Sequence, residues 1–277
     1  MTQKANNAKP KTQRPRLVKW LWIIALSPFA LLFFLLALTA IGLFGKLPSF
    51  EELENPKSNI ATEIYSEDGK VIGSFFVQNR SYVEYAELFP EDSSLLMCLD
   101  GDSVPAVVAA LISTEDERFM SHSGIDIKAL IRVGVKTIAL GNSGQGGGST
   151  ITQQVAKNLF PRDTTSRGPV MRKVSLVISK LKEWITAVKL EYNYTKEELV
   201  AMYLNTVEYG SNAYGIKSAA RTFFNKTPDQ LNIQEAAVLV GVVNKPTRYN
   251  PVLNYDHSIA RRNTVMSRMR ANGCISR

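Results

Sequence analysis

The most continuous run of hydrophobic residues lies near the start of the chain. Between Trp20 and Gly45 there are 26 uncharged positions, in which Leu, Phe, Ile and Ala dominate. Roughly 20 apolar residues let a helix cross a bilayer, so this run predicts an uncleaved transmembrane helix over 20–45, with which Pro28 is compatible. A cleaved signal peptide is the alternative, but its apolar core is usually about 7 to 15 residues long, and no clear small-x-small cleavage site follows Leu43.

The next part of the chain changes to a short alternating pattern. Residues 46–59 are polar and contain prolines, and the following "ATEIYSEDGKVIGSFFV" alternates on either side of Asp68 and Gly69. An Asp-Gly pair favours a tight hairpin turn between two strands. Residues 46–104 are therefore predicted to form a connector and a small β-rich stalk.

From Pro105 onward the hydrophobic period becomes helical. Val108, Leu111 and Ile112 share one helix face, and Glu115 ends that apolar face. A second apolar stripe lies between residues 166 and 190, at Val174, Val177, Leu181, Trp184 and Val188.

Two later helix starts have capping signatures. Thr195 is followed by Glu198, and Asn232 is followed by Glu235. This spacing lets the two side chains satisfy backbone N–H groups at the start of a helix. Strand patterns are sparse after residue 100, so this larger part of the chain is predicted to be mainly α.

The charge pattern also predicts how the transmembrane helix is oriented in the membrane. Residues 1–19 contain no acidic residue and six cations, which are Lys4, Lys9, Lys11, Arg14, Arg16 and Lys19. The positive-inside rule predicts that this basic tail stays in the cytoplasm and that the rest of the chain lies outside. Removing these six from the 33 Lys and Arg leaves 27 against 25 Asp and Glu, a balance near +2 that argues against a nucleic-acid-binding protein.

A glycine-rich segment, "QGGGSTITQQVAKN" over residues 145–158, leads into a predicted helix. Backbone N–H groups at such a helix start can bind phosphate. A helix from about Thr150 would place Thr150, Gln154 and Lys157 on one face. The G-K-[ST] ending of a nucleotide-binding loop is missing, which disfavours a nucleoside triphosphate. The alternative is a flexible linker before an ordinary amphipathic helix.

Basic residues continue after this segment. Within the span only Asp163 opposes a set of cations, which are Lys157, Arg162, Arg167, Arg172, Lys173, Lys180 and Lys182. A solvated helix face is the usual explanation for such a run. The local surplus also suits a polyanion such as a pyrophosphate.

Three carboxylates are candidates for chemistry. Glu115 ends an apolar face and is a candidate proton acceptor. Glu183 lies three residues after Lys180, so a surface ion pair is its alternative interpretation. Asp116 could instead cap the turn that leads to His122. Two carboxylates beside an anion site form a pattern typical of sugar transfer at an anomeric carbon.

Cysteine spacing gives no metal site. Cys98 and Cys274 are the two cysteines of the chain, and we expect them to be unpaired thiols, a disulfide between them in an oxidising compartment being the alternative.

Five ordered segments resemble the motifs of glycosyltransferase family 51, the peptidoglycan glycosyltransferase module of class A penicillin-binding proteins and their monofunctional relatives. The segments are "STEDERFMSHSGID", "GGGSTITQQVAKN", "KLKEWITAVKLEYNYTKEELVAMYLN", "VEYGSNAYGIKSAARTFF" and "LNIQEAAVLVGVVNKPTRYNP". The resemblance implies a mainly α, lysozyme-like domain over 105–272, with a head lobe and a smaller jaw lobe that dips into the membrane. Residues 273–277 would then begin a linker or a tail.

The resemblance also implies a reaction. The family polymerises lipid II with inversion at the donor sugar and releases undecaprenyl pyrophosphate. Glu115 matches the general base and Glu183 the second glutamate, which assists at the pyrophosphate. The substrate contacts fall on Asp116, Phe119, His122, Ser149, Thr150, Gln154, Lys157, Asn158 and Lys180.

The chain departs from the family pattern at some points. Ser179 stands where the family usually has arginine before Lys180, so either Arg172 reaches the site or one donor contact is missing. The segment 91–102 is extra. Ser179 and Lys182 match S-x-x-K, but the other transpeptidase signatures are absent, so we interpret the match as helix surface. A longer protein with a transpeptidase domain remains an alternative.

The expected partners follow from the same resemblance. They are lipid II, the growing glycan strand, membrane lipid, moenomycin-type inhibitors and a cell-wall synthesis complex at the bacterial inner membrane. No cofactor is required by the sequence, although Mg²⁺ or another divalent ion could share the pyrophosphate with Glu183. A lysozyme-type hydrolase and a non-catalytic wall-binding module are the alternative functions.

Overall fold

The computed structural model describes residues 14–49, 62–67, 71–75, 79–80, 82–99, 101–140, 148–160 and 168–275. The chain divides into two compact units, Met1–Leu47 and Pro48–Arg277. In both units the described residues are mainly helical, which confirms the predicted fold class.

The first unit is dominated by one helix, α1 (Arg14–Ala40). Its segment Val18–Ala40 has a mean hydropathy of 2.6 and is long and apolar enough to cross a bilayer. The predicted helix is thus present, with Pro28 inside it, but it ends at Ala40 instead of Gly45. The early end has a local cause, because Gly42 and Gly45 adopt φ values of +83° and +101° that a right-handed helix does not accommodate.

The second unit begins with a strand pair. The strands β1 (Thr62–Tyr65) and β2 (Val71–Phe75) pair antiparallel, with Thr62 opposite Phe75. This pairing confirms the predicted hairpin strands, while the turn at Asp68 and Gly69 lies outside the described residues.

A central buried helix organises the helical part. Every residue of α3 (Ala106–Glu115) from Ala106 to Thr114 is buried. It packs against α9 (Ile233–Val243) and α10 (Tyr255–Ala271), which also pack against each other. The predicted helix is therefore correct, but it is covered on all sides instead of having one apolar face. Its small residues, Ala106, Ala109 and Ala110, suit this close packing.

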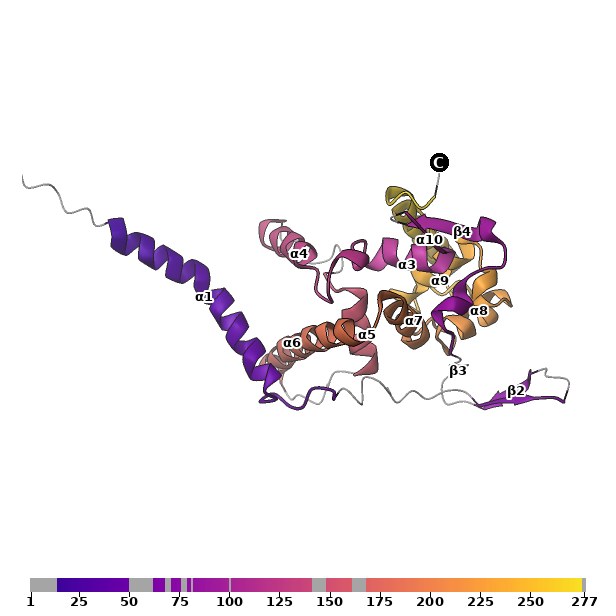
Figure 1. The fold of residues 1–277 in the computed structure, drawn as a ribbon, viewed down its shortest axis with the longest axis horizontal. Coiled ribbons are helices and arrows are strands. Elements are labelled where there is room, and N and C mark those ends of the chain that lie inside the picture. Colours follow the sequence, from indigo (N-terminus) through magenta and orange to yellow (C-terminus); the bar gives the residue numbers. More distant parts are fainter. Residues whose placement is uncertain are drawn as a thin grey trace, which may run out of the picture. The chain divides into compact units, whose positions relative to one another are not determined.

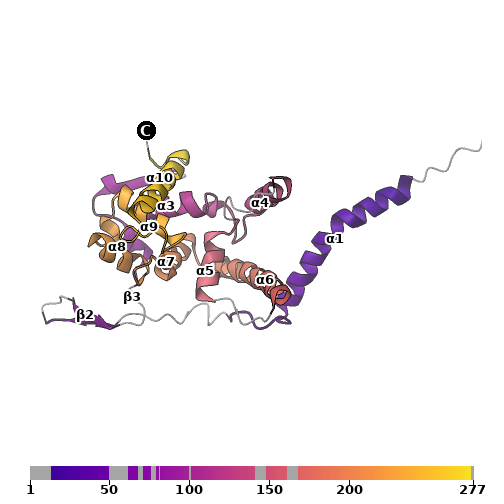
Figure 2. The ribbon, with the colours of Figure 1, turned by 180° about the vertical axis from the view of Figure 1, so that it is seen from behind.

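The other α-helices of the second unit lie between α3 and α9 in the sequence. Their bounds are α4 (Ile127–Leu140), α5 (Ile151–Leu159), α6 (Pro169–Asn193), α7 (Lys196–Thr206) and α8 (Ile216–Phe224). The short η helices are η1 (Tyr85–Leu88), η2 (Ser93–Leu95), η3 (Phe119–Ser121) and η4 (Pro228–Gln230). α5 packs against α6 and α7. Both views show α7, α8, α9 and α10 gathered at one end of this unit, with α4 and α6 extending from the other end (Figures 1 and 2).

Capping explains where two of these helices begin. The Thr195 side chain accepts from the Glu198 N–H while the Glu198 side chain accepts from the Thr195 N–H. Asn232 and Glu235 make the same reciprocal pair at the start of α9. Both predicted capping boxes are confirmed.

The residues just before α3 belong to the same core. The hairpin of β4 (Leu96–Leu99) and β5 (Asp102–Pro105) leads directly into α3, and Met97, Leu99 and Val104 are buried. The extra segment 91–102 thus has a structural account, because its first turn is capped by Asp92 and its strand adds apolar side chains to the core.

A second connection is long-range. β3 (Asn79–Arg80) pairs parallel with β6 (Ala213–Tyr214). Next to it, the Asn205 amide accepts from the Val83 N–H at 3.0 Å and donates to the Val83 carbonyl at 2.8 Å. Residues 79–80, 82–99 and 101–104 are thereby tied to the helices, whereas they were predicted to belong to the stalk.

Apolar side chains remain exposed on two helices. On α4 these are Ile127, Ile131 and Val135, and on α6 they are Val170, Met171, Val174, Leu176, Val177 and Val188. The stripe predicted on α6 is therefore only partly buried, with Leu181 inside and Val174 and Val177 outside.

The two cysteines are unpaired thiols, as predicted. Cys98 is exposed and Cys274 is buried.

Candidate active site

Glu115 stands at the end of the buried helix α3. Its side chain is 16% exposed, so the carboxylate reaches the surface of the core without entering bulk water. Gln154 Nε2 donates to Glu115 Oε2 at 3.1 Å, and Arg261 Nη2 lies 3.8 Å from Oε1. An amide donor and a guanidinium therefore face the two oxygens of this carboxylate, and a carboxylate so placed is a candidate proton acceptor.

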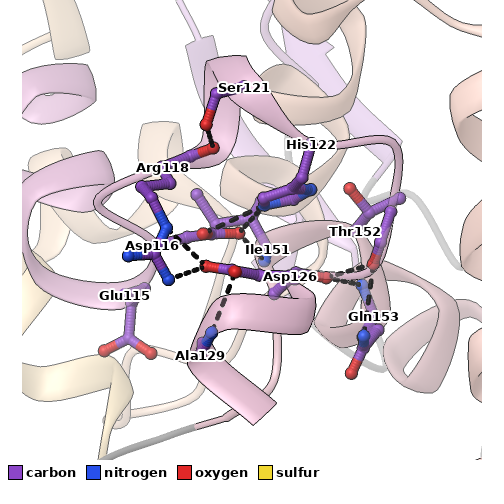
Figure 3. A network of polar contacts seen from close by, with 12 residues as sticks. Glu115, Asp116, Arg118, Ser121, His122, Asp126, Ala129, Ile151, Thr152 and Gln153 are labelled. Carbon is purple, nitrogen blue, oxygen red and sulfur yellow. Dashed lines mark hydrogen bonds and ion pairs between the residues drawn. The ribbon is translucent and has the colours of Figure 1, made fainter. Parts of the chain in front are cut away.

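The next residue, Asp116, joins three chain segments. Its carboxylate accepts from the Ile151 backbone N–H at 3.0 Å and lies 3.0 Å from His122 Nε2 (Figure 3). Asp116 thus holds the N-terminus of α5 against the end of α3. A capping role was the alternative interpretation of this residue, and it does cap a backbone, although that backbone belongs to α5 and not to its own turn.

A second carboxylate fixes the same loop. Arg118 Nη2 lies 2.7 Å from Asp126 Oδ2, and Asp126 Oδ1 accepts from the Ala129 N–H at the start of α4 (Figure 3). Burial works to raise the pKa of Asp126, but the hydrogen bond from Ala129 and the Arg118 guanidinium outweigh it and hold the pKa below its ordinary value. The contacts of Asp116 and Asp126 therefore hold the loop from Glu115 to Ile127 in place at both of its ends.

Phe119 and His122 lie inside this loop. Phe119 is fully buried, and Lys196 Nζ lies 4.3 Å from the centre of its ring. Lys196 also donates to the His122 carbonyl and forms an ion pair with Glu191 at 2.7 Å. Lys196 thus contacts both predicted site residues and helps to hold the loop around Glu115, while a substrate contact at either residue stays a prediction.

Gly124 is where the loop meets α5 and α6. Its carbonyl accepts from Thr150 Oγ1 at 2.7 Å and from Gln153 Nε2 at 3.2 Å. It has φ +84°, and a Cβ atom at this position would lie 2.9 Å from the backbone carbonyl of Ala187. Only glycine fits here without moving the backbone of α6.

We therefore expect Gly124→Ala to lower the free energy of unfolding by about 2–4 kcal/mol, because positive φ costs of order 1 kcal/mol and the backbone contact adds overpacking strain. Gly273→Ala is the matched control, since Gly273 also has a positive φ of +75° but nothing within 4 Å of its Cβ position. Denaturant unfolding of both variants measures the difference. Equal losses in the two would show that the contact with Ala187 is relaxed without cost.

The glycine-rich segment is only partly described, since residues 141–147 lie outside the described ranges. Thr150 is the N-cap of α5, is 1% exposed, and accepts from the Gln153 N–H in addition to its bond to Gly124. Gln154 is half-buried, and Lys157 and Asn158 are exposed. Thr150, Gln154 and Lys157 therefore do not form one open face, because the Thr150 hydroxyl is turned inward.

A second polar cluster combines α6 with the start of α5. Lys180 Nζ donates to Ser149 Oγ at 2.9 Å and to Glu183 Oε2 at 3.0 Å. The Glu183 side chain is 6% exposed and that of Lys180 is 31% exposed. The pair is therefore not the surface ion pair of the alternative interpretation, because its carboxylate is buried and its ammonium group is partly open to solvent.

Arg172 lies in the first turns of α6 and is exposed. At about 1.5 Å per residue it is roughly 12 Å from Lys180 along the helix axis. Ser179 is half-buried beside Lys180. Arg162 and Arg167 lie outside the described residues.

Two further residues near Glu115, neither of them predicted, belong to its surroundings. Arg261 comes from α10, and among the described residues its buried Nε has no hydrogen-bond partner. Tyr203 comes from α7, is fully buried, and donates to Gln154 Oε1 at 3.2 Å. No local pattern marks either residue, because their place beside Glu115 depends on how α5, α7 and α10 pack.

Over the described ranges, no group of three or more His, Cys, Asp or Glu side chains is placed to hold a metal ion.

Comparison with known proteins gives consistent matches. A family model described as Transglycosylase matches residues 69–270. Penicillin-binding protein 1A of Pseudomonas aeruginosa is 34% identical over 260 residues, which covers 94% of this chain and 28% of the relative. Penicillin-binding protein 1A of Escherichia coli is 35% identical over 233 residues, which covers 83% of this chain and 24% of the relative.

These relatives are much longer than the chain, which spans about a quarter of their length. A crystal structure of penicillin-binding protein 1A from Haemophilus influenzae has a TM-score of 0.38 and 22% identity, covering 80% of this chain and 19% of that one.

Proposed function

Because this chain belongs to the transglycosylase family, we propose that it is a peptidoglycan glycosyltransferase that polymerises lipid II into glycan strands for the cell wall. The observation that carries this proposal is the position of Glu115. A largely buried carboxylate, held between an amide donor and a guanidinium, is suited to take a proton from a sugar hydroxyl.

In the proposed reaction, Glu115 takes the proton from the 4-hydroxyl of the acceptor's GlcNAc. The oxygen then attacks the anomeric carbon of the donor with inversion. The bond between that carbon and the pyrophosphate breaks, and its electron pair leaves with undecaprenyl pyrophosphate. The partly exposed Lys180 ammonium would stabilise this negative charge as it develops.

Glu183 then acts through Lys180. A buried carboxylate in direct contact with a departing pyrophosphate would repel it, whereas a carboxylate that holds the Lys180 ammonium in place would assist departure. Ser149, on the other side of Lys180, fixes the ammonium relative to the start of α5. Lys157 and Asn158 are exposed on α5 and remain proposed contacts of the pyrophosphate. Mg²⁺ at this place remains a proposal as well.

The apolar surfaces support a reaction at the membrane. The helix α1 can anchor the chain, and the exposed apolar residues of α4 and α6 suit a jaw that dips into the bilayer. A lipid-tailed substrate would then meet the site by diffusion in two dimensions. We propose an inner-membrane location with the N-terminus in the cytoplasm, and a cell-wall synthesis complex as partner.

The proposal is tested by giving the purified protein labelled lipid II and, separately, finished glycan. We expect ladders of growing strands from lipid II, and their loss when moenomycin occupies the donor site. Shortening of finished glycan without any growth would favour a lysozyme-type hydrolase. Binding of lipid II without growth in any detergent would favour a non-catalytic wall-binding module.

A further inference from the structure

A chain of hydrogen bonds leads from the interior of the protein to Glu115. The Tyr203 hydroxyl donates to Gln154 Oε1 at 3.2 Å, and Gln154 Nε2 donates to Glu115 Oε2 at 3.1 Å. The three residues come from α7, α5 and α3, and α5 packs directly against α7. The geometry of the carboxylate is thus set from a position that a substrate does not reach, because Tyr203 is fully buried.

In this series of hydrogen bonds, Tyr203 is the donor to Gln154, and Gln154 is the donor to Glu115. Burial raises the pKa of Tyr203 well above its ordinary value, and the negative charge of Glu115 raises it further, so the phenol keeps its proton. A phenol that keeps its proton donates to the amide oxygen of Gln154. With its oxygen bound to Tyr203, Gln154 turns its NH₂ group toward Glu115 and donates to Oε2.

Resting on the proposed function, we propose that Tyr203 is a positioning residue of the reaction, which acts through Gln154 to hold the Glu115 carboxylate in the orientation of a proton acceptor. Gln154 is then a support of the base, in addition to the pyrophosphate contact that the resemblance implies. Its half-buried side chain is already engaged at both ends by Tyr203 and Glu115.

The contacts that the other charged groups make around Glu115 do not involve Tyr203 or Gln154. Arg261 of α10 faces the opposite carboxylate oxygen, Oε1, and Arg268 of the same helix donates to the Thr114 carbonyl. The Asp116 carboxylate is engaged by His122 and by the Ile151 N–H. Removing the Tyr203 hydroxyl therefore changes the orientation of the amide and leaves these groups in place.

The test is Tyr203→Phe in the full chain. Without its partner the Gln154 amide can rotate and turn its oxygen toward Glu115, which disfavours the carboxylate. We expect the acid limb of the pH–rate profile for lipid II polymerisation to move up by about one pH unit, so that kcat falls about tenfold below the limb. We expect kcat to recover at higher pH and KM for lipid II to stay within about twofold.

Tyr209→Phe is the matched control. Tyr209 is also fully buried, and among the described residues its hydroxyl has no hydrogen-bond partner. Its loss removes the same atom from the same core without touching Gln154, so the pH–rate profile should keep its position. Equal profiles for the Tyr203 and Tyr209 variants would overturn the proposal.

A second variant tests whether the effect passes through Gln154. In Gln154→Leu the link is gone, so adding Tyr203→Phe should change the acid limb no further. A further shift of similar size in the double variant would show that Tyr203 acts by another route, and would overturn the proposal.

A measurement without substrate separates this proposal from the proposed function. The ¹⁵N-labelled side-chain amide of Gln154, assigned by its loss in Gln154→Leu, should report the protonation of Glu115 as pH is varied. In Tyr203→Phe the pH at the midpoint of this change in the amide signal should rise, as the acid limb of the pH–rate profile does. If this midpoint rises but the unchanged protein makes no glycan, the proposed function is wrong, while the inference that Tyr203 acts on Glu115 through Gln154 is supported. If the midpoint does not change, the inference that Tyr203 acts on Glu115 through Gln154 is wrong, even when glycan is made.

Discussion

Replacing Glu115 with glutamine is expected to lower lipid II polymerisation about a thousandfold, because proton transfer by a positioned side chain typically contributes a factor of about 10² to 10⁴. Glutamine has nearly the same shape as glutamate but cannot accept the proton of the attacking hydroxyl. Lipid II binding should stay close to that of the unchanged protein, since the Ser149, Lys180 and Glu183 cluster is not altered. Glycan synthesis and lipid II binding are measured on the same preparation.

Glu117 offers a matched control for this variant. It lies two residues further along the same loop and is exposed, in contrast to the largely buried Glu115. Glu117→Gln removes the same charge and should polymerise at the normal rate. If Glu115→Gln polymerised as fast as Glu117→Gln, Glu115 could not be the base.

The local features of this site could be predicted from the sequence. The capping boxes at Thr195 and Asn232 depend on residues three apart, and both are present. The helix that carries Glu115 is also present, because its apolar residues dominate any local pattern. The pattern could not show that this helix is covered on every side, since that depends on α9 and α10, which are far away in the sequence.

The contacts that arrange the site were harder to predict. Thr150 lies in a glycine-rich segment of the kind that binds anions. Its hydroxyl nevertheless points inward and donates to the carbonyl of Gly124, which is 26 residues away in the sequence. Tyr203 lies within a predicted helix, but its partner Gln154 is 49 residues away. Asn205 and Val83 are separated by 122 residues. Such pairs form when helices pack, and the hydrophobic period of each helix gives no information about which polar residues then meet.

The cluster around Lys180 leads to the second large effect. We expect Lys180→Met to lower kcat/KM for lipid II about a hundredfold, because a charge-assisted contact to the pyrophosphate is lost. The variant should also lower the free energy of unfolding by about 1–3 kcal/mol, because Glu183 keeps a buried charge without this ammonium partner. This loss is smaller than for a fully buried ion pair, because the Lys180 side chain is partly exposed. Lys217→Met, on the exposed face of α8, controls for the loss of one positive charge.

The double variant Lys180→Met with Glu183→Gln separates stability from catalysis. It removes both charges, so the free energy of unfolding should return close to that of the unchanged protein. Polymerisation should not return, because neither the ammonium nor the carboxylate that orients it is present. Recovery of polymerisation in the double variant would mean that the single variant failed only because the buried Glu183 carboxylate had lost the Lys180 ammonium. In that case the charge of the leaving pyrophosphate must be stabilised elsewhere, with exposed Lys157 on α5 as the next residue to replace.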